Sequence, residues 1–361
     1  IGITQIFNEG VKKIEIGILG FKVMFFYTFL AVLAFAYTQG EEQLKVFLRR
    51  IVYFSIPLCF FGFFQFRADP NFMVNQFGRG FERAVMMAHI DNQVDSFLRV
   101  FSTFASSGQY ASFLVINGAF ILGLMFSAKR PSEKVFMGIC LAINTMSILT
   151  TGSRGSAVLM VAVIFVFMVL CKRVAKQVFI ILLLAGILQF AFNFFGRGVI
   201  SRFESLKDTD MLKDRTMRTT QGMFDEYLVQ YPLGRGMGTA SGASRYLQTE
   251  VAGEELAFIE NYPTKLLYET GIFGVIFCYM VIVLLAKRIW RFAFRIARAR
   301  GDALFAALAS YCLVLFAYSL FFVYDPPPAG LFLWAIIGMV AKLMNLSKNE
   351  PQQSYGGQPT I

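Results

Sequence analysis

The chain has 361 residues, of which 56% are hydrophobic and only 16% are charged, and Phe alone occurs 42 times. Soluble globular proteins carry about 25% charged residues. The composition therefore excludes an ordinary soluble domain, a disordered chain and a disulfide scaffold, and it predicts a polytopic membrane protein. The net charge of +11 does not indicate a nucleic-acid partner, because membrane proteins carry Lys and Arg on cytoplasmic connections and no basic stretch forms a soluble module of its own.

Nine apolar stretches approach the length of about 20 residues that a membrane-spanning helix needs. They cover residues 17–38, 47–66, 111–128, 135–151, 156–171, 177–195, 271–286, 302–323 and 330–346. Each stretch is continuously apolar rather than alternating, which favours helices over the strands of a barrel. The predicted fold class is an all-α polytopic membrane protein with about nine transmembrane helices.

Every second connection between these stretches is basic, which predicts that this set lies in the cytoplasm. The basic set comprises residues 39–50, 129–134, 172–176 and 287–300, and the extracytoplasmic set comprises 67–110, 152–155, 196–270 and 324–329. With nine helices and a cytoplasmic C-terminus, residue 1 lies outside, and we expect a further N-terminal portion with more helices to precede it.

Three parts of the chain follow from this topology. Residues 1–16 are predicted to be a polar extracytoplasmic segment, and residues 17–346 are predicted to form the transmembrane catalytic domain. Residues 347–361, rich in Gln and Gly, read as a flexible cytoplasmic tail. Neither a metal nor a cofactor is expected, because the five cysteines lack metal-ligand spacing and the single histidine, His89, cannot form a His-based site alone.

The extracytoplasmic connections are rich in arginine, which membrane orientation does not require. The arginines are Arg67, Arg79, Arg83, Arg99, Arg154, Arg197, Arg202, Arg215, Arg218, Arg235 and Arg245. Arginine binds phosphate with two parallel hydrogen bonds and keeps its charge, so a polyprenyl pyrophosphate that carries sugars is a plausible ligand. The alternative is that these arginines are solvated loop charges paired with nearby aspartates and glutamates.

One arginine stands in a tight turn between two apolar stretches. Arg154 lies within Thr150–Ser156, whose glycines permit close backbone approach. Ionisable groups held at the membrane are costly and often functional, so we predict a functional role for Arg154. A snorkelling anchor to lipid phosphate is the structural alternative.

The long connection 196–270 is predicted to be functional, because an idle connection would be shorter. It contains the stretch Tyr231–Gly238 with three alternate glycines, which lacks the strand and βαβ context of a dinucleotide fingerprint. Near its end, Glu260 is placed to take a proton from a sugar hydroxyl as a general base. Pairing of Glu260 with an arginine is an equal alternative.

Four stretches together resemble the O-antigen ligase and polymerase superfamily of bacterial envelope enzymes. They are Arg99–Phe113, the turn around Arg154, Tyr231–Gly238, and Glu260–Gly274 with its Glu-x-Gly at Glu269 and Gly271. The resemblance implies a fold similar to the C-type glycosyltransferases, metal-independent, with a long helical extracytoplasmic loop over a cavity. Ligases of the superfamily carry histidine where this chain has Glu260, so the resemblance favours a polymerase.

The resemblance also implies roles for individual residues. The candidate catalytic residues are Glu260, Arg154 and Arg215, and the candidate substrate-binding residues are Arg99, Arg218, Arg235, Asn261 and Tyr262. The expected partners are a polyprenyl pyrophosphate-linked oligosaccharide, the lipid bilayer and a chain-length regulator protein. The expected location is the bacterial inner membrane, with the site facing the periplasm or exterior.

Three other functions remain open from the sequence. A ligase would transfer finished glycan to lipid A core or protein and differs only in its acceptor. A transporter or flippase of lipid-linked sugar would carry charges inside its helices, where this chain has few, Lys22 being the clearest. A peptidoglycan-type polymerase would need an outer aspartate as its base, and Asp325 is the candidate.

Overall fold

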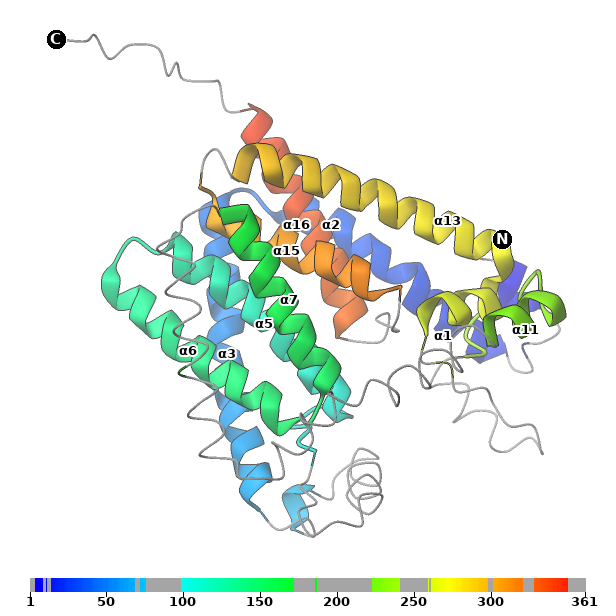
Figure 1. Ribbon diagram of the computed structural model, residues 1–361, viewed down its shortest axis with the longest axis horizontal. Coiled ribbons are helices and arrows are strands. Elements are labelled where there is room, and N and C mark those ends of the chain that lie inside the picture. Colours follow the sequence, from blue (N-terminus) through cyan, green and yellow to red (C-terminus); the bar gives the residue numbers. More distant parts are fainter. Residues whose placement is uncertain are drawn as a thin grey trace.

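The computed structural model describes residues 4–8, 11, 14–68, 72–75, 99–171, 186, 223–240, 259, 261–297, 301–320 and 328–349. Within these ranges every regular element is a helix (Figure 1). The α-helices are α1 (Ile14–Met24), α2 (Phe29–Tyr37), α3 (Glu41–Arg67), α5 (Ser107–Ser127), α6 (Pro131–Thr150), α7 (Arg154–Cys171), α11 (Met223–Gln230), α13 (Tyr262–Phe292), α15 (Ala303–Tyr318) and α16 (Ala329–Asn349). The predicted all-α polytopic membrane fold is confirmed.

Seven helical segments among the described residues are long and apolar enough to cross a membrane, against nine predicted. They are Ile14–Tyr37, Glu41–Arg67, Ser107–Ser127, Pro131–Thr150, Arg154–Cys171, Tyr262–Arg295 and Ala329–Lys348. The predicted helix at 302–323 corresponds to the shorter α15, and the predicted helix at 177–195 lies outside the described residues apart from Gly186. The count therefore differs because one predicted helix is shorter and another is not described.

Helix α5 forms the centre of the bundle (Figure 1). It packs against α3, α6, α7 and α15, and nearly all of its residues from Tyr110 to Met125 are buried. By contrast, α3 and α13 expose large apolar side chains such as Phe54, Phe273 and Phe277. Exposed apolar surface of this extent suits contact with lipid rather than with water, as expected for membrane-spanning helices.

A buried amide pair joins the helices around α5. The Asn117 Nδ2 donates hydrogen bonds to the Ser55 Oγ of α3, at 2.8 Å, and to the Asn144 Oδ1 of α6, at 3.0 Å. The Asn144 Nδ2 in turn donates to the Leu114 carbonyl of α5 at 2.9 Å. Polar side chains hydrogen-bond between helices in membranes in this way, so the pair sets the register of α3, α5 and α6.

We predict that Asn117 and Asn144 stabilise the bundle cooperatively. Replacing either one with Leu should lower the free energy of unfolding by about 1 kcal/mol, because its partner is left unsatisfied in an apolar interior. Changing both should cost less than the sum of the single changes. Unfolding in detergent gives the three values, with the lipid-facing Ile139→Leu as a control; strictly additive losses would contradict the coupling.

Candidate functional site

The predicted turn at Arg154 is short and internally hydrogen-bonded. Helix α6 ends at Thr150, the chain reverses through Gly152 at φ 62°, and α7 begins at Arg154. The Thr151 Oγ1 donates to the Ile148 carbonyl at 2.6 Å, and the Ser153 Oγ donates to the Ser156 Oγ at 2.9 Å. The turn therefore holds the partly buried Arg154 at the first position of a spanning helix.

The first motif of the sequence meets this turn. The Arg99 Nε donates to the Thr151 carbonyl at 3.2 Å, and the Val100 backbone N–H donates to the Thr150 carbonyl at the same distance. Arg99 and Arg154, 55 positions apart in the numbering, are thus attached to one turn. The structure thus brings these two motifs together at one turn.

Two buried polar residues that sequence reasoning missed hold the segment after Arg99. Ser102 has φ 51°, a left-handed conformation uncommon for a non-glycine residue. Its Oγ donates to the Leu58 carbonyl at 2.9 Å, and its own carbonyl accepts from the Gln65 Nε2 at 3.2 Å. Both partners belong to α3, so the C-terminal part of α3 anchors the segment that carries Arg99. In the sequence, only the single Gln65 near the end of an apolar stretch could have indicated these hydrogen bonds.

The glycine stretch Tyr231–Gly238 is a packing element. Gly234, at φ 85°, lies against the backbone of α13, where a Cβ atom would come within 2.6 Å of the Gly271 nitrogen. Gly271 has φ 73° and ψ −177° and interrupts α13, and a Cβ there would come within 2.5 Å of the Pro232 oxygen. The Ile272 backbone N–H donates to that same oxygen at 3.0 Å. Only glycine fits this contact, so the alternate glycines serve close backbone approach.

The interruption at Gly271 also corrects a predicted boundary. Residues 262–270 were assigned to the end of the long connection, but they form the first part of α13, which continues as the spanning helix after Gly271. The predicted connection thus ends in a helix of its own. Its described remainder contains the short helix α11, next to α13 (Figure 1).

The N-terminal segment holds the glycine stretch from the other side. The Gln5 Nε2 donates to the Leu233 carbonyl at 2.7 Å, and the Gln5 carbonyl accepts from the Met237 N–H at 3.1 Å. The Asn8 Nδ2 donates to the Gly234 carbonyl at 3.2 Å. Sequence reasoning treated this segment only as polar, and nothing in its local pattern indicated a partner more than 200 residues away.

Arg235 is surrounded by tyrosines. Its guanidinium NH1 donates to the Tyr268 hydroxyl at 2.6 Å, and its Cζ lies 5.6 Å from the Tyr231 ring centre and 5.8 Å from that of Tyr268. Tyr227 of α11 packs on Tyr268 with ring centres 4.8 Å apart. Burial, and next the neighbouring Tyr268, raise the pKa of Tyr227 above its ordinary value, so its phenol is neutral at neutral pH. Arg235 is thus a cation held by aromatic faces.

A buried carboxyl group, that of Glu269, lies next to Tyr268 in the first part of α13. Glu269 is only 4% exposed, and its Oε1 accepts a hydrogen bond from the Ala240 N–H at 3.2 Å. Lys265, one turn earlier, is 5% exposed. Buried charges of this kind are retained where hydrogen bonds satisfy them. Glu269 therefore fastens the end of the glycine stretch to α13.

Asn261 and Tyr262, both predicted to bind substrate, begin α13. The Asn261 Oδ1 caps the helix by accepting from the Thr264 N–H at 3.1 Å and the Thr264 Oγ1 at 3.2 Å. Tyr262 is 4% exposed, and its hydroxyl lies 4.0 Å from the Cys278 Sγ of the same helix. Asn261 therefore has a structural role, whereas Tyr262 lines a cavity.

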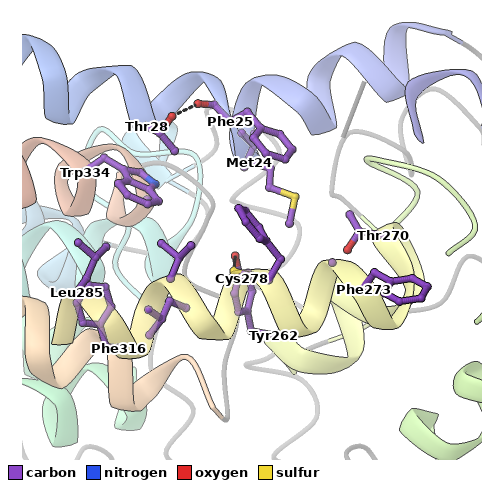
Figure 2. Close-up of a pocket in the computed structure, with 16 residues that line it drawn as sticks. Met24, Phe25, Thr28, Tyr262, Thr270, Phe273, Cys278, Leu285, Phe316 and Trp334 are labelled. Atoms are coloured by element: carbon purple, nitrogen blue, oxygen red, sulfur yellow. Dashed lines mark hydrogen bonds between the residues drawn. The ribbon is translucent and has the colours of Figure 1, made fainter. Parts of the chain in front are cut away.

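This cavity has a volume of about 410 Å³ and is almost entirely apolar. Figure 2 shows it between the N-terminal helices and α13, with Thr270 and Phe273 toward one end, Trp334, Leu285 and Phe316 toward the other, and Tyr262 beside Cys278 between them. The exposed Phe273 and Phe277 also line it. The cavity therefore extends along the spanning part of α13 from Thr270, which lies next to the break at Gly271.

The described candidate residues form two groups. Arg99 and Arg154 belong to the turn in the α5–α7 bundle, whereas Arg235, Asn261 and Tyr262 lie with α11 and the first part of α13, at one edge of the molecule (Figure 1). The predicted residues Glu260, Arg215 and Arg218, and also Asp325, lie outside the described residues. Within the described ranges, no three His, Cys, Asp or Glu side chains gather as metal ligands would.

The fold and this site define a polytopic α-helical membrane protein with an apolar cavity, which is lined in part by motif residues of α13 such as Tyr262 and Thr270. Residues 139–279 match the family described as O-Antigen ligase. The match confirms the predicted resemblance to the O-antigen ligase and polymerase superfamily over that part of the chain. It includes three of the four motif stretches, and the Arg99 stretch precedes it. Comparison with curated proteins finds no match.

We predict that the glycine contact is essential for the site. Gly271→Ala or Gly234→Ala should lower the free energy of unfolding by about 1–3 kcal/mol, because each combines a left-handed φ with a backbone clash. The matched control is Gly138→Ala in α6, where a Cβ meets nothing within 4 Å and the change should be neutral or stabilising. Thermal unfolding in detergent compares them, and equal midpoints for all three variants would contradict the packing role.

Proposed function

We propose that the protein joins polyprenyl pyrophosphate-linked oligosaccharide repeat units into a surface polysaccharide. The observation that carries the proposal is the apolar cavity lined by Tyr262 and Thr270, two residues within the segment matched to the O-Antigen ligase family. A lipid-linked sugar needs an apolar path for its tail beside a polar site for its headgroup. The cavity along α13 supplies the first, and the arginine-bearing turns supply candidates for the second.

In the proposed reaction, an acceptor sugar hydroxyl attacks the anomeric carbon of the donor. The new glycosidic C–O bond forms as the bond from that carbon to the phosphate oxygen breaks, and the pyrophosphate leaves with the bonding electron pair. Glu260 takes the proton of the hydroxyl as general base. Arginine guanidinium groups stabilise the negative charge that develops on the leaving group.

Arg154 is the arginine best supported for that role among the described residues. It stands at the N-terminus of α7, where backbone N–H groups and the helix dipole favour an anion. Arg99 is attached to the same turn through the Thr151 carbonyl. We assign Arg215 and Arg218 to the same anion from the sequence alone, and Arg235, held among tyrosines, to the sugar-bearing side of the donor.

A ligase remains the second candidate, because the matched family is described as O-Antigen ligase. Glu260 in place of the ligase histidine favours the polymerase. Polysaccharide gels of cells that lack the gene separate the two: loss of a polymerase leaves single repeat units, whereas loss of a ligase leaves polymer on the lipid carrier. A transporter is tested by incubating purified protein with a defined lipid-linked donor and acceptor, since only an enzyme forms a longer glycan.

We predict that Arg154→Ala abolishes polymer formation without preventing membrane insertion. Loss of one positioned donor to a developing anion typically costs about 100-fold or more in rate. Arg154→Lys should restore little, because lysine lacks the planar fork for bidentate phosphate contacts. The control is Arg130→Ala, an exposed arginine at the start of α6. Polymer of normal length from Arg154→Ala would rule the role out.

We predict a similar loss for Glu260→Gln, because the amide cannot accept the proton. The matched control is Glu226→Gln in α11, an exposed carboxylate of the same connection, which should leave polymer length unchanged. Complementation of a deletion strain, with immunoblots of membrane fractions, measures both. Wild-type polymer with Glu260→Gln would exclude the base assignment while leaving the arginine sites untouched.

We also predict that the lipid tail of the donor binds in the cavity along α13. Val281 lines the cavity, so Val281→Trp should occupy part of it and raise the KM for a long polyprenyl donor about tenfold. A tenfold change equals about 1.4 kcal/mol, and each displaced CH₂ group costs about 0.8 kcal/mol. Val283→Trp, exposed on the same helix and outside the cavity, is the control. Equal KM values for the two variants would show that the tail binds elsewhere.

A further inference from the structure

A second cavity, of about 340 Å³, lies at the opposite end of α13 from the candidate site. It is formed by the last turns of α13 and α16, which come together at their C-terminal ends (Figure 1), with Phe35 of α2 as a third side. Its inner wall is apolar and includes Ile289 and Met344. Both helices are candidate membrane spans, so the cavity lies where they leave the bilayer.

Positive charge surrounds the mouth of this cavity. Arg288 and Lys348 line it together with the Asn345 amide, and none of the lining residues is acidic. Both cations are exposed, and neither forms an ion pair with another described residue. The Lys342 Nζ lies 5.1 Å from the ring centre of Phe35, which adds a third positive charge next to the cavity. The site therefore combines an apolar wall with two exposed cations that no acidic side chain among the described residues pairs with.

We propose that this cavity binds an anionic phospholipid from the leaflet that the basic connections predict to be cytoplasmic. An acyl chain would lie on the apolar wall, and the phosphate would accept hydrogen bonds from Arg288 and Lys348, in the manner of basic pockets between spanning helices. A zwitterionic lipid fits less well, because it brings its own cation to a rim that is already positive. Leu285 lines both cavities, but this proposal does not depend on the proposed function, because Arg288 and Lys348 lie in the last turns of α13 and α16, away from the motif residues.

The test measures thermal unfolding of the purified full chain in neutral detergent with added phosphatidylglycerol, or with phosphatidylcholine of the same acyl chains. A ligand that binds only the folded state raises the unfolding midpoint, so phosphatidylglycerol should raise it by several degrees and phosphatidylcholine by clearly less. Glycerol 3-phosphate, a phosphate anion without acyl chains, should have no effect. Equal shifts from the two lipids, or a full shift from glycerol 3-phosphate, would overturn the proposal.

Three variants test whether the shift caused by phosphatidylglycerol arises at this cavity. Arg288→Gln/Lys348→Gln should remove most of the phosphatidylglycerol shift, whereas Lys287→Gln/Arg291→Gln, which deletes two cations outside the cavity near the same end of α13, should keep it. Met344→Trp, which fills the apolar wall and keeps every charge, should also reduce the shift. Unchanged shifts in the first and third variants, or equal losses in the two double variants, would overturn the proposal even if one variant folds poorly.

Discussion

The candidate site depends on one close approach between two stretches of backbone. The glycine stretch 231–238 reaches α13 because neither Gly234 nor Gly271 has a Cβ atom, and the Ile272 N–H can then bond to the Pro232 carbonyl. This contact interrupts α13 and divides it into a first part, which carries motif residues, and a spanning part, which lines the cavity. The orientation of Tyr262 and Tyr268 relative to the membrane-spanning helix follows from that break.

Charge is organised differently at the two ends of the molecule. At the candidate site, the described cations are engaged by backbone and aromatic groups: Arg99 by the Thr151 carbonyl and Arg235 by Tyr268 and Tyr231. At the other end, Arg288 and Lys348 are exposed around an apolar cavity. Positioned cations suit a reaction that develops charge at one point, whereas flexible exposed cations suit the headgroup of a lipid.

Membrane insertion explains why the polar interior is small but specific. Helices in lipid gain little from burying apolar surface against each other, so their register relies on packing and on hydrogen bonds such as the Ser55–Asn117–Asn144 chain. The same reasoning applies to Gln65 and Ser102, whose hydrogen bonds fix the segment that carries Arg99. Small buried polar groups thus place the larger cations that stand at the helix ends.

The sequence alone determined the membrane class, most of the helices and the tight turn at Arg154, because apolar length and local glycines are properties of neighbouring residues. It also predicted that four motifs belong together, from their order along the chain and from the side of the membrane on which they were expected. Only the tertiary structure decided that Arg99 bonds to the Arg154 turn, that Gln5 and Asn8 hold the glycine stretch, and that Asn261 serves as a helix cap. The physical reason is that the contacts of Arg99, Gln5 and Asn8 join residues about 50 to more than 220 positions apart, which no local pattern reveals. The cap depends on α13 beginning at Tyr262, which the predicted boundary at residue 271 had missed.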